Sequence, residues 1–229
     1  MSRLIAVYGQ RHEPDWLVED LRANLAPWVD GFAMVDDRAR PASDAWGHEG
    51  AFRWRQRQAA IDAGADWVLV VDPDERLEDR AGETIRAEID RRGNDPVLLR
   101  LTLRELFTPT QYRVDGVWGR YRRTRLYPVR DDQAPSPKPI HAPPVPVTHG
   151  YAVVDLDVNL YHLKMVEPRN RYARAAAYNR AEMQAYRRVN TRWRRMYGVA
   201  GMRLEPIPVG REFTPGYTRP YLIDPPRTR

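Results

Sequence analysis

The feature that most constrains this chain is an unbroken apolar run that ends in acidic residues. Residues 67–71 read Trp-Val-Leu-Val-Val, and Asp72, Pro73, Asp74 and Glu75 follow. Five consecutive apolar residues fit a strand that is buried on both faces, which is typical of a parallel sheet covered by helices. Ligands of open α/β sheets bind beyond the carboxyl ends of the strands, so the acidic residues are expected at a binding edge.

Strands and helices are predicted to alternate through the first hundred residues. Leu17, Leu21 and Leu25 lie four residues apart, on one face of a helix that Pro14 can begin. The expected strands cover residues 4–8, 31–36, 67–72 and 97–103, and further helices are expected over 52–63 and 81–91. This order predicts an α/β fold with a mainly parallel sheet and helices on both of its faces.

The pattern changes after residue 103. Residues 112–127 are predicted to form antiparallel strands, and residues 153–161 form a further strand. Six prolines between residues 135 and 146 predict an irregular loop, and residues 169–197 indicate a long helix rich in Arg and Tyr. No internal repeat and no linker between separate domains are apparent.

The net charge of +6 is concentrated towards the C-terminus. From Met165 onward the chain has 14 arginines and 5 acidic residues. Such a basic segment suits nucleotide phosphates, nucleic acid or anionic lipid, although a solvated arginine-rich helix has the same composition. The absence of cysteine excludes disulfides and thiolate metal sites. Without a transmembrane stretch or the pattern of a cleaved signal, a cytoplasmic protein is expected.

Asp72 and Asp74 are candidate ligands for a divalent cation. Side chains i and i+2 of an extended chain lie on the same side, so the two carboxylates would converge on one ion. Oxygen ligands suit Mg²⁺ or Mn²⁺, which keep waters and take phosphate oxygens as further ligands. A solvated turn is the alternative, because Asp-x-Asp is common in loops. The position of this Asp-x-Asp at the end of an apolar strand favours a metal site.

Residues 57–77 resemble the family 2-like glycosyltransferases with the GT-A fold, in particular a small bacterial branch related to lipopolysaccharide-core transferases. The resemblance lies in the helical run Arg57-Gln58-Ala59-Ala60-Ile61-Asp62-Ala63, followed by the tryptophan strand and its Asp-x-Asp-Glu end. It covers the first half of the chain well and the second half at scattered points. It implies an inverting transfer of a hexosyl or pentosyl group from a nucleoside-diphosphate sugar, first of all a UDP-sugar, to an acceptor hydroxyl.

The resemblance also implies a role for individual residues. The expected donor contacts are Tyr8, Arg11, Glu13, Asp36, Arg57, Asp72 and Lys164, and the expected metal ligands are Asp72, Asp74 and His162. The second strand continues into Asp36-Asp37-Arg38 instead of the usual Gly-Ser-Thr-Asp turn, so base recognition stays open. Asp36 could instead cap a turn, Glu13 could favour a helix start, and Arg57 could lie on the helix surface.

An inverting transfer needs a base that takes the acceptor proton. Related transferases often have Val-His-Glu near Ile140-His141-Ala142, where this chain lacks the glutamate. Asp115 is the first substitute, followed by Glu105 and His141. Each of the three could equally be structural.

The acceptor is left open between a saccharide, a protein hydroxyl and a hydroxylated DNA base. Nine arginines and five aromatic residues between positions 169 and 197 make DNA or another polyanion a candidate partner.

We assign residues 1–104 to the nucleotide-sugar half, 105–164 to the acceptor-side half of the same domain, and 165–229 to a basic helix and tail. A nucleotidyltransferase and a non-catalytic nucleic-acid-binding protein derived from a transferase are the alternatives.

Overall fold

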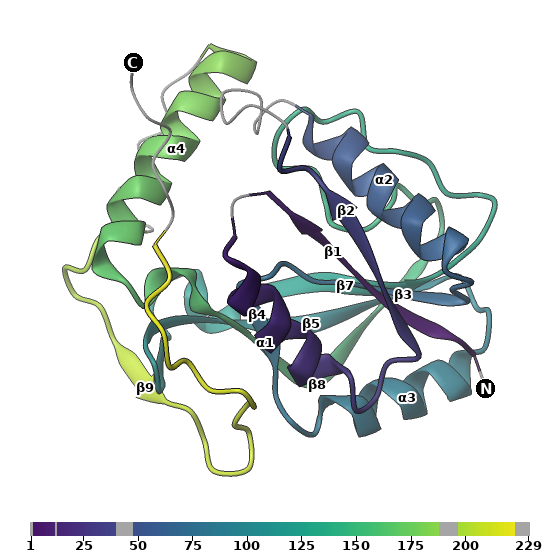
Figure 1. The fold of residues 1–229 in the computed structure, drawn as a ribbon, viewed down its shortest axis with the longest axis horizontal. Coiled ribbons are helices and arrows are strands. Elements are labelled where there is room, and N and C mark those ends of the chain that lie inside the picture. The colour runs from purple at the N-terminus through teal and green to yellow at the C-terminus, as the bar shows by residue number, and fades with distance from the viewer. Residues whose placement is uncertain (1, 12, 40–47, 188–196, 223–229) are drawn as a thin grey trace.

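The computed structural model describes residues 2–11, 13–39, 48–187 and 197–222 (Figure 1). Among them, no helix is long and apolar enough to cross a membrane. In chain order, the elements are β1 (Leu4–Gln10), α1 (Asp15–Leu25), β2 (Gly31–Asp36), α2 (Glu49–Asp62), β3 (Trp67–Val70), β4 (Glu75–Leu77), α3 (Ala81–Arg92), β5 (Val97–Thr108), β6 (Gln111–Arg113), the 3-10 turn η2 (Trp118–Arg120), β7 (Arg122–Pro128), β8 (Ala152–His162), the 3-10 turn η3 (Leu163–Met165), α4 (Pro168–Tyr186) and β9 (Leu204–Pro206).

One mixed sheet organises the fold. Its order is β2-β1-β3-β7-β5-β6-β9, and β8 pairs with both β5 and β4. β1 runs parallel to β2 and β3, whereas β7 is antiparallel to β3 and β5. The parallel first half and the antiparallel strands of the second half were both predicted. The parallel pairing of β8 with β5 was not, and it carries residues from the second half to the same sheet edge.

The alternating side chains of β1 explain why helices cover both faces of the sheet. Leu4, Ala6 and Tyr8 pack into a core with α1 and α3, whereas Ile5 and Val7 pack on the other face with α2. All seven residues of β1 are buried. Because both faces of the strand lie in apolar surroundings, its sequence is continuously apolar instead of alternating.

The C-terminal helix is shorter than predicted. α4 ends at Tyr186, because Arg187 adopts a left-handed conformation with φ of 51° and its amide closes the last turn on Met183. Such a residue ends a helix by satisfying a carbonyl that would otherwise have no partner. Residues 188–196 of the predicted helix lie outside the described part of the chain, and Tyr197, its last residue, is helical.

The described tail returns to the first half of the molecule. After β9 it passes between α4 and α1, as the yellow segment of Figure 1 shows. The Asn24 side chain in α1 donates to the carbonyl of Thr214, and Asn170 in α4 donates to the carbonyl of Tyr221. β5 also runs through the predicted boundary at residue 104, so the three assigned parts share one sheet and one set of cores.

Candidate functional site

The acidic run forms a turn between β3 and β4, not an extended segment. The Glu75 amide donates to the Asp72 carbonyl at 2.9 Å, and the Asp72 amide donates to the Glu75 carboxylate at 2.9 Å. The turn thus replaces the extended backbone on which the expected i, i+2 convergence was based. Lys164 lowers the pKa of both carboxylates, and their convergence on one ion stays a prediction.

A buried arginine holds this turn from behind. The guanidinium of Arg76 donates to the carbonyls of Pro73, Glu75 and Leu17, and the residue is 1% exposed. Burial lowers its pKa to about 10, although Asp20 and Asp74 act in the opposite direction. The planar, five-donor group joins the turn to α1, which a lysine could not do.

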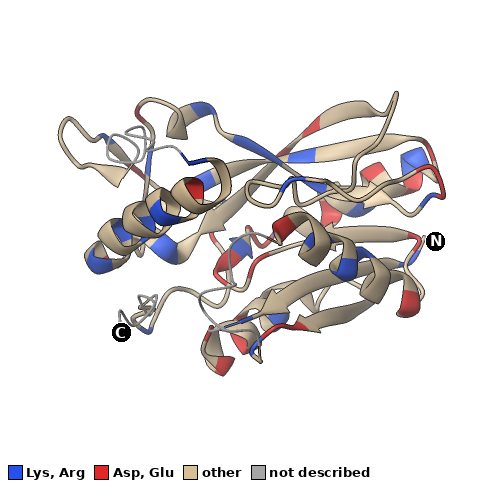
Figure 2. Ribbon diagram, turned by 90° about the horizontal axis from the view of Figure 1, so that it is seen from above, with Lys and Arg blue, Asp and Glu red and all other residues tan. Residues whose placement is uncertain are grey.

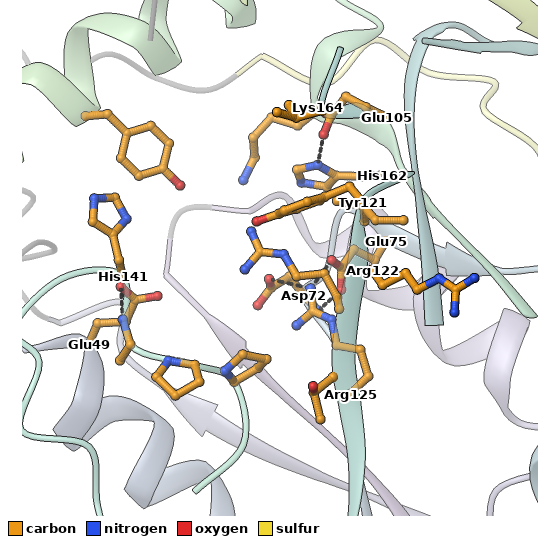
Figure 3. Close-up of a pocket in the computed structure, with 18 of the residues that line it drawn as sticks. Glu49, Asp72, Glu75, Glu105, Tyr121, Arg122, Arg125, His141, His162 and Lys164 are labelled. Carbon is orange, nitrogen blue, oxygen red and sulfur yellow. Dashed lines mark hydrogen bonds and ion pairs between the residues drawn. The ribbon is translucent and has the colours of Figure 1, made fainter. Parts of the chain in front are cut away.

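A cavity of about 740 Å³ opens in front of the turn. Its walls come from α2, the β3–β4 turn, β7, the end of β8 with η3, the proline-rich loop and α4. Figure 3 shows Asp72, Glu75, His162 and Lys164 on one side of the cavity and His141 and Glu49 on the other. The cavity brings together segments that lie far apart in the sequence.

Asp74, His162 and Glu105 form a buried chain of polar contacts. His162 Nδ1 lies 2.9 Å from Glu105 Oε2, and His162 Nε2 lies 3.4 Å from Asp74 Oδ2. Burial disfavours the charged imidazole, but Glu105 and Asp74 together raise the His162 pKa to about 10. Lys164 Nζ is 2.7 Å from the same Asp74 oxygen. Burial raises the pKa of Asp74, but Lys164 and His162 outweigh it, so the net shift is downward.

The side chains of Asp74 and His162 are candidate donors for a divalent cation. Asp74 Oδ2 is buried and accepts no hydrogen bond of good geometry from a described residue, despite its two cationic neighbours. Glu105 would orient His162 through Nδ1, as a carboxylate does behind a metal-bound histidine. No three described His, Asp or Glu residues are grouped for a metal. Asp74 and His162 supply two donors, so an ion held there would need waters and phosphate oxygens for the rest of its shell.

Asp72 has arginine partners instead. Its carboxylate lies 3.1 Å from Arg53 Nη1 and 3.5 Å from Arg125 Nη2, and about a third of its side chain is exposed. Burial raises the Asp72 pKa, but Arg53, Arg125 and Lys164 together lower it by more, so the net shift is downward. Arg125 also pairs with the buried carboxylate of Glu75. Asp72 thus stays ionised at the cavity wall and holds the guanidinium of Arg53 there.

Arg57, an expected donor contact, does not line the cavity. Its guanidinium donates to Gln133 Oε1 at 2.8 Å and to the Arg130 carbonyl at 2.7 Å, and it stacks on Trp54. It therefore anchors α2 to the segment after β7. Arg53, one helical turn earlier, lines the cavity instead.

The other expected donor contacts lie beside the end of β1. The Tyr8 side chain is buried, and its hydroxyl accepts from the guanidinium of exposed Arg22. Glu13 accepts from the amide of Arg11. The structure does not test whether Arg11, Glu13 and Asp36 contact a nucleotide, and those assignments stay predictions.

Asp37, which the sequence did not single out, is the better buried of the two aspartates after β2. Its carboxylate forms ion pairs with Arg11 at 3.0 Å and with Arg55 at 2.8 Å, whereas Asp36 is exposed and pairs with Arg38. Hydrogen bonds from Arg38 lower the pKa of Asp36 to about 2. A run of two aspartates gives no sequence signal that tells which one is buried.

Two of the three base candidates have structural partners. Arg113 donates to both carboxylate oxygens of Asp115, at 2.8 and 2.7 Å, and lowers its pKa to about 2. Asp115 also accepts from the Arg203 amide. A carboxylate held by a bidentate arginine is a poor proton acceptor, which counts against Asp115 as the base. Glu105 lines the cavity but is committed to His162.

The third candidate, His141, faces the cavity with partners that the sequence did not predict. Its Nε2 lies 3.2 Å from Glu182 Oε1 of α4, and its ring stacks on Tyr178 of the same helix. Tyr178 in turn stacks on Tyr197. Glu182 is the one acidic residue in the sequence of α4, and this isolation among arginines was its available signal.

Basic residues spread along α4 (Figure 2). Two of its arginines have structural roles. Arg171 donates to the carbonyls of Met165 and Phe107, and Arg174 donates to the hydroxyl of Tyr178 at the cavity. Arg169 and Arg180 are exposed. Arg188, Arg192, Arg194 and Arg195 lie outside the described residues, so the polyanion surface stays a prediction.

No protein-family model matches the chain, and no curated protein matches its sequence. Among solved structures, S. aureus TarS 1–349 is 13% identical, with a TM-score of 0.42 over 80% of this chain and 66% of that one. The same protein in complex with UDP-GlcNAc is 14% identical, with a TM-score of 0.44 over 80% and 67%. This chain thus spans about two thirds of TarS 1–349 and 40% of the longer TarS chain.

Proposed function

We propose that this protein transfers a sugar from a nucleoside-diphosphate sugar to an acceptor hydroxyl. The observation that carries the proposal is the Asp74–His162–Glu105 chain at a cavity of about 740 Å³, with Lys164 beside it. Such a cavity is large enough for a small ligand, and the lysine and arginine side chains in its wall suit phosphates. The resemblance of residues 57–77 gives the reaction class, with a UDP-sugar as the first donor to test.

Asp74 and His162 would hold Mg²⁺ or Mn²⁺ in this proposal. When bound, the ion would neutralise charge on the departing diphosphate as a Lewis acid. Lys164 and Arg53 line the cavity and would contact the phosphate oxygens. Asp72 would keep Arg53 in place and border the ribose. The metal role of Asp72 that the sequence suggested stays a prediction.

A thermal-shift panel tests the proposal. Nucleoside diphosphates, their sugars and nucleoside triphosphates are each added with Mn²⁺, Mg²⁺ or EDTA. We expect a diphosphate or its sugar to raise the melting temperature with metal, because a ligand at 100 times its Kd stabilises by about 2.7 kcal/mol. Selective stabilisation by triphosphates would instead favour a nucleotidyltransferase. If no diphosphate or its sugar stabilises the protein with metal present, the proposal fails.

Asp74→Asn probes the metal within the same panel. The amide keeps the size of the side chain but removes the charge, so the metal-dependent part of the shift should disappear. We choose asparagine over alanine because a cavity next to His162 and Lys164 would also destabilise the fold. The control is Asp95→Asn, since Asp95 is largely exposed and lies outside the cavity wall. A full metal-dependent shift in Asp74→Asn would place the metal elsewhere.

The acceptor stays a prediction with three classes. Exposed Arg169 and Arg180 keep DNA among them. Binding to duplex DNA that weakens steeply with salt would favour a hydroxylated base, because phosphate contacts release counterions.

A further inference from the structure

His141 and Glu182 form a pair on the wall opposite the proposed donor site. Figure 3 shows His141 across the cavity from Asp72 and His162. The imidazole Nε2 lies 3.2 Å from Glu182 Oε1, and 33% of the His141 side chain is exposed against 1% for Glu182. A buried carboxylate that contacts a partly exposed imidazole can fix its tautomer and the orientation of its ring.

The loop that carries His141 is held against the start of α2. The amides of Glu49 and Gly50 donate to the carbonyls of Pro139 and Lys138, and the Ala142 amide donates to the Glu49 carboxylate. Gly50 is required for this approach, since a Cβ there would lie 2.0 Å from the Ser136 carbonyl oxygen. Contacts on both sides of His141 thus set the position of its side chain.

His141 also has an unusual backbone conformation. Its φ is 59°, in the left-handed region that non-glycine residues rarely adopt. Such a conformation costs of the order of 1 kcal/mol and persists where the surrounding structure imposes it, often at functional sites. Buried Ile140 on one side and the Ala142 hydrogen bond on the other hold it here.

We propose that His141 is the catalytic base of the transfer and that Glu182 is its positioning residue. The Nε2–H group would donate to Glu182, and Nδ1 would take the acceptor proton. The acceptor oxygen then forms its bond to the anomeric carbon while the bond from that carbon to the diphosphate breaks, with its electron pair leaving on the diphosphate. The imidazolium then returns its proton to solvent.

The other acids of the cavity wall are committed to different partners. Glu105 contacts His162, Glu75 contacts Arg125, and Asp72 contacts Arg53. Glu49 holds the Ala142 amide. Glu105 and Glu182 both contact a histidine of the wall, but His162 belongs to the proposed metal site, whereas His141 lies across the cavity from it (Figure 3). A helix distant in sequence thus supplies the carboxylate that is absent at residue 142.

The test measures UDP release from UDP-glucose and UDP-N-acetylglucosamine with Mn²⁺, with water as the acceptor. It compares wild type with His141→Gln and Glu182→Gln. Both variants should lower kcat roughly 100-fold or more, as expected for loss of a general base, and leave the donor KM within about twofold. The controls are His149→Gln and Glu205→Gln, whose positions are exposed and which should keep the wild-type kcat. Melting temperatures and the UDP-induced thermal shift show whether each variant is folded and binds donor.

The inference rests on the proposed function, and the outcomes distinguish the two. A wild type that is not stabilised by UDP with Mn²⁺ would overturn both. A wild type that binds UDP but hydrolyses neither sugar would overturn the base assignment alone, as would an unchanged kcat in folded His141→Gln. A loss in His141→Gln without a loss in Glu182→Gln would overturn the role of Glu182. A rise in KM at constant kcat would make the pair a binding element, not a base.

Discussion

Arg76 carries a positive charge in the interior, where it meets mainly backbone carbonyls. Three carbonyls from two segments accept from its guanidinium, and Asp20 lies 3.9 Å away. A buried arginine is tolerated when its donors are satisfied and its charge is partly compensated. The local pattern Asp-Glu-Arg-Leu does not reveal this role, because an arginine after an acidic turn is usually exposed.

We predict that Arg76→Met destabilises the protein by about 2–4 kcal/mol, because it leaves buried carbonyls without a donor. Urea unfolding followed by far-UV circular dichroism measures the change. The matched control is Arg91→Met, since the Arg91 side chain is 59% exposed and pairs with Glu88 at the surface. Such a surface pair contributes about 0–1 kcal/mol. Equal stability of the two variants would contradict the role of Arg76.

Arg53 and Arg57 mark the limit of prediction for single residues. They are separated by one helical turn, so helix periodicity places them on the same side of α2. The structure nevertheless sends Arg53 to Asp72 and Arg57 to Gln133 and the Arg130 carbonyl. The choice depends on where β7 ends and how the following segment turns, and no local sequence pattern contains that information.

Among the elements, the start of α2 and the proline-rich loop form one unit. The helix supplies amides and a carboxylate, and the loop supplies the carbonyls of Lys138 and Pro139. The prolines of this loop correctly predicted its irregular backbone, because proline has no backbone N–H to donate to a neighbouring strand. They did not predict that the loop would dock on a helix start, which depends on the missing side chain of Gly50.

We predict that Gly50→Ala displaces this loop, because the new Cβ would meet backbone that has little room to move. The expected cost is about 1–3 kcal/mol, as for other overpacked sites, together with a fall in UDP release as His141 shifts. Gly216→Ala is the control, since a Cβ there meets nothing within 4 Å. Thermal unfolding and the UDP-release assay report the two effects. Wild-type values for both would show that the loop does not depend on Gly50.

For the whole molecule, the described tail connects regions that are distant in sequence. Phe213 and Tyr221 pack in a core with Leu17 of α1 and Tyr161 of β8. The Tyr161 hydroxyl also donates to the Arg211 carbonyl at 2.6 Å. This packing covers the side of β8 behind His162, so the tail supports the strand that carries the proposed metal ligand.

We predict that Phe213→Ala lowers the free energy of unfolding by about 3–5 kcal/mol, the range for deletion of a buried aromatic side chain. The loss should appear in one cooperative transition, with fluorescence and circular dichroism coinciding. Val209→Ala is the control in the same tail, because Val209 is 96% exposed. A loss below about 1 kcal/mol in Phe213→Ala would mean that the tail packs less firmly than these contacts indicate.

The sequence by itself determined the acidic end of a buried strand, the alternation of the first half and the antiparallel character of the second. These features follow from local periodicity and from runs of apolar residues, which report burial within one element. The sequence also singled out Asp74, His162 and Glu105, but it did not predict that His162 contacts the other two. His162 and Glu105 are 57 residues apart, and His141 and Glu182 are 41 apart.

Only the tertiary structure decided those pairings, the turn from Asp72 to Glu75 and the contact of Asp115 with Arg113. The physical reason is that contacts between distant segments depend on strand register and helix docking. The parallel pairing of β8 with β5 puts His162 opposite Glu105, and the docking of α4 puts Glu182 beside His141. Side chains of one sequence can satisfy their charges in several ways, and the packing of the whole chain selects one of them.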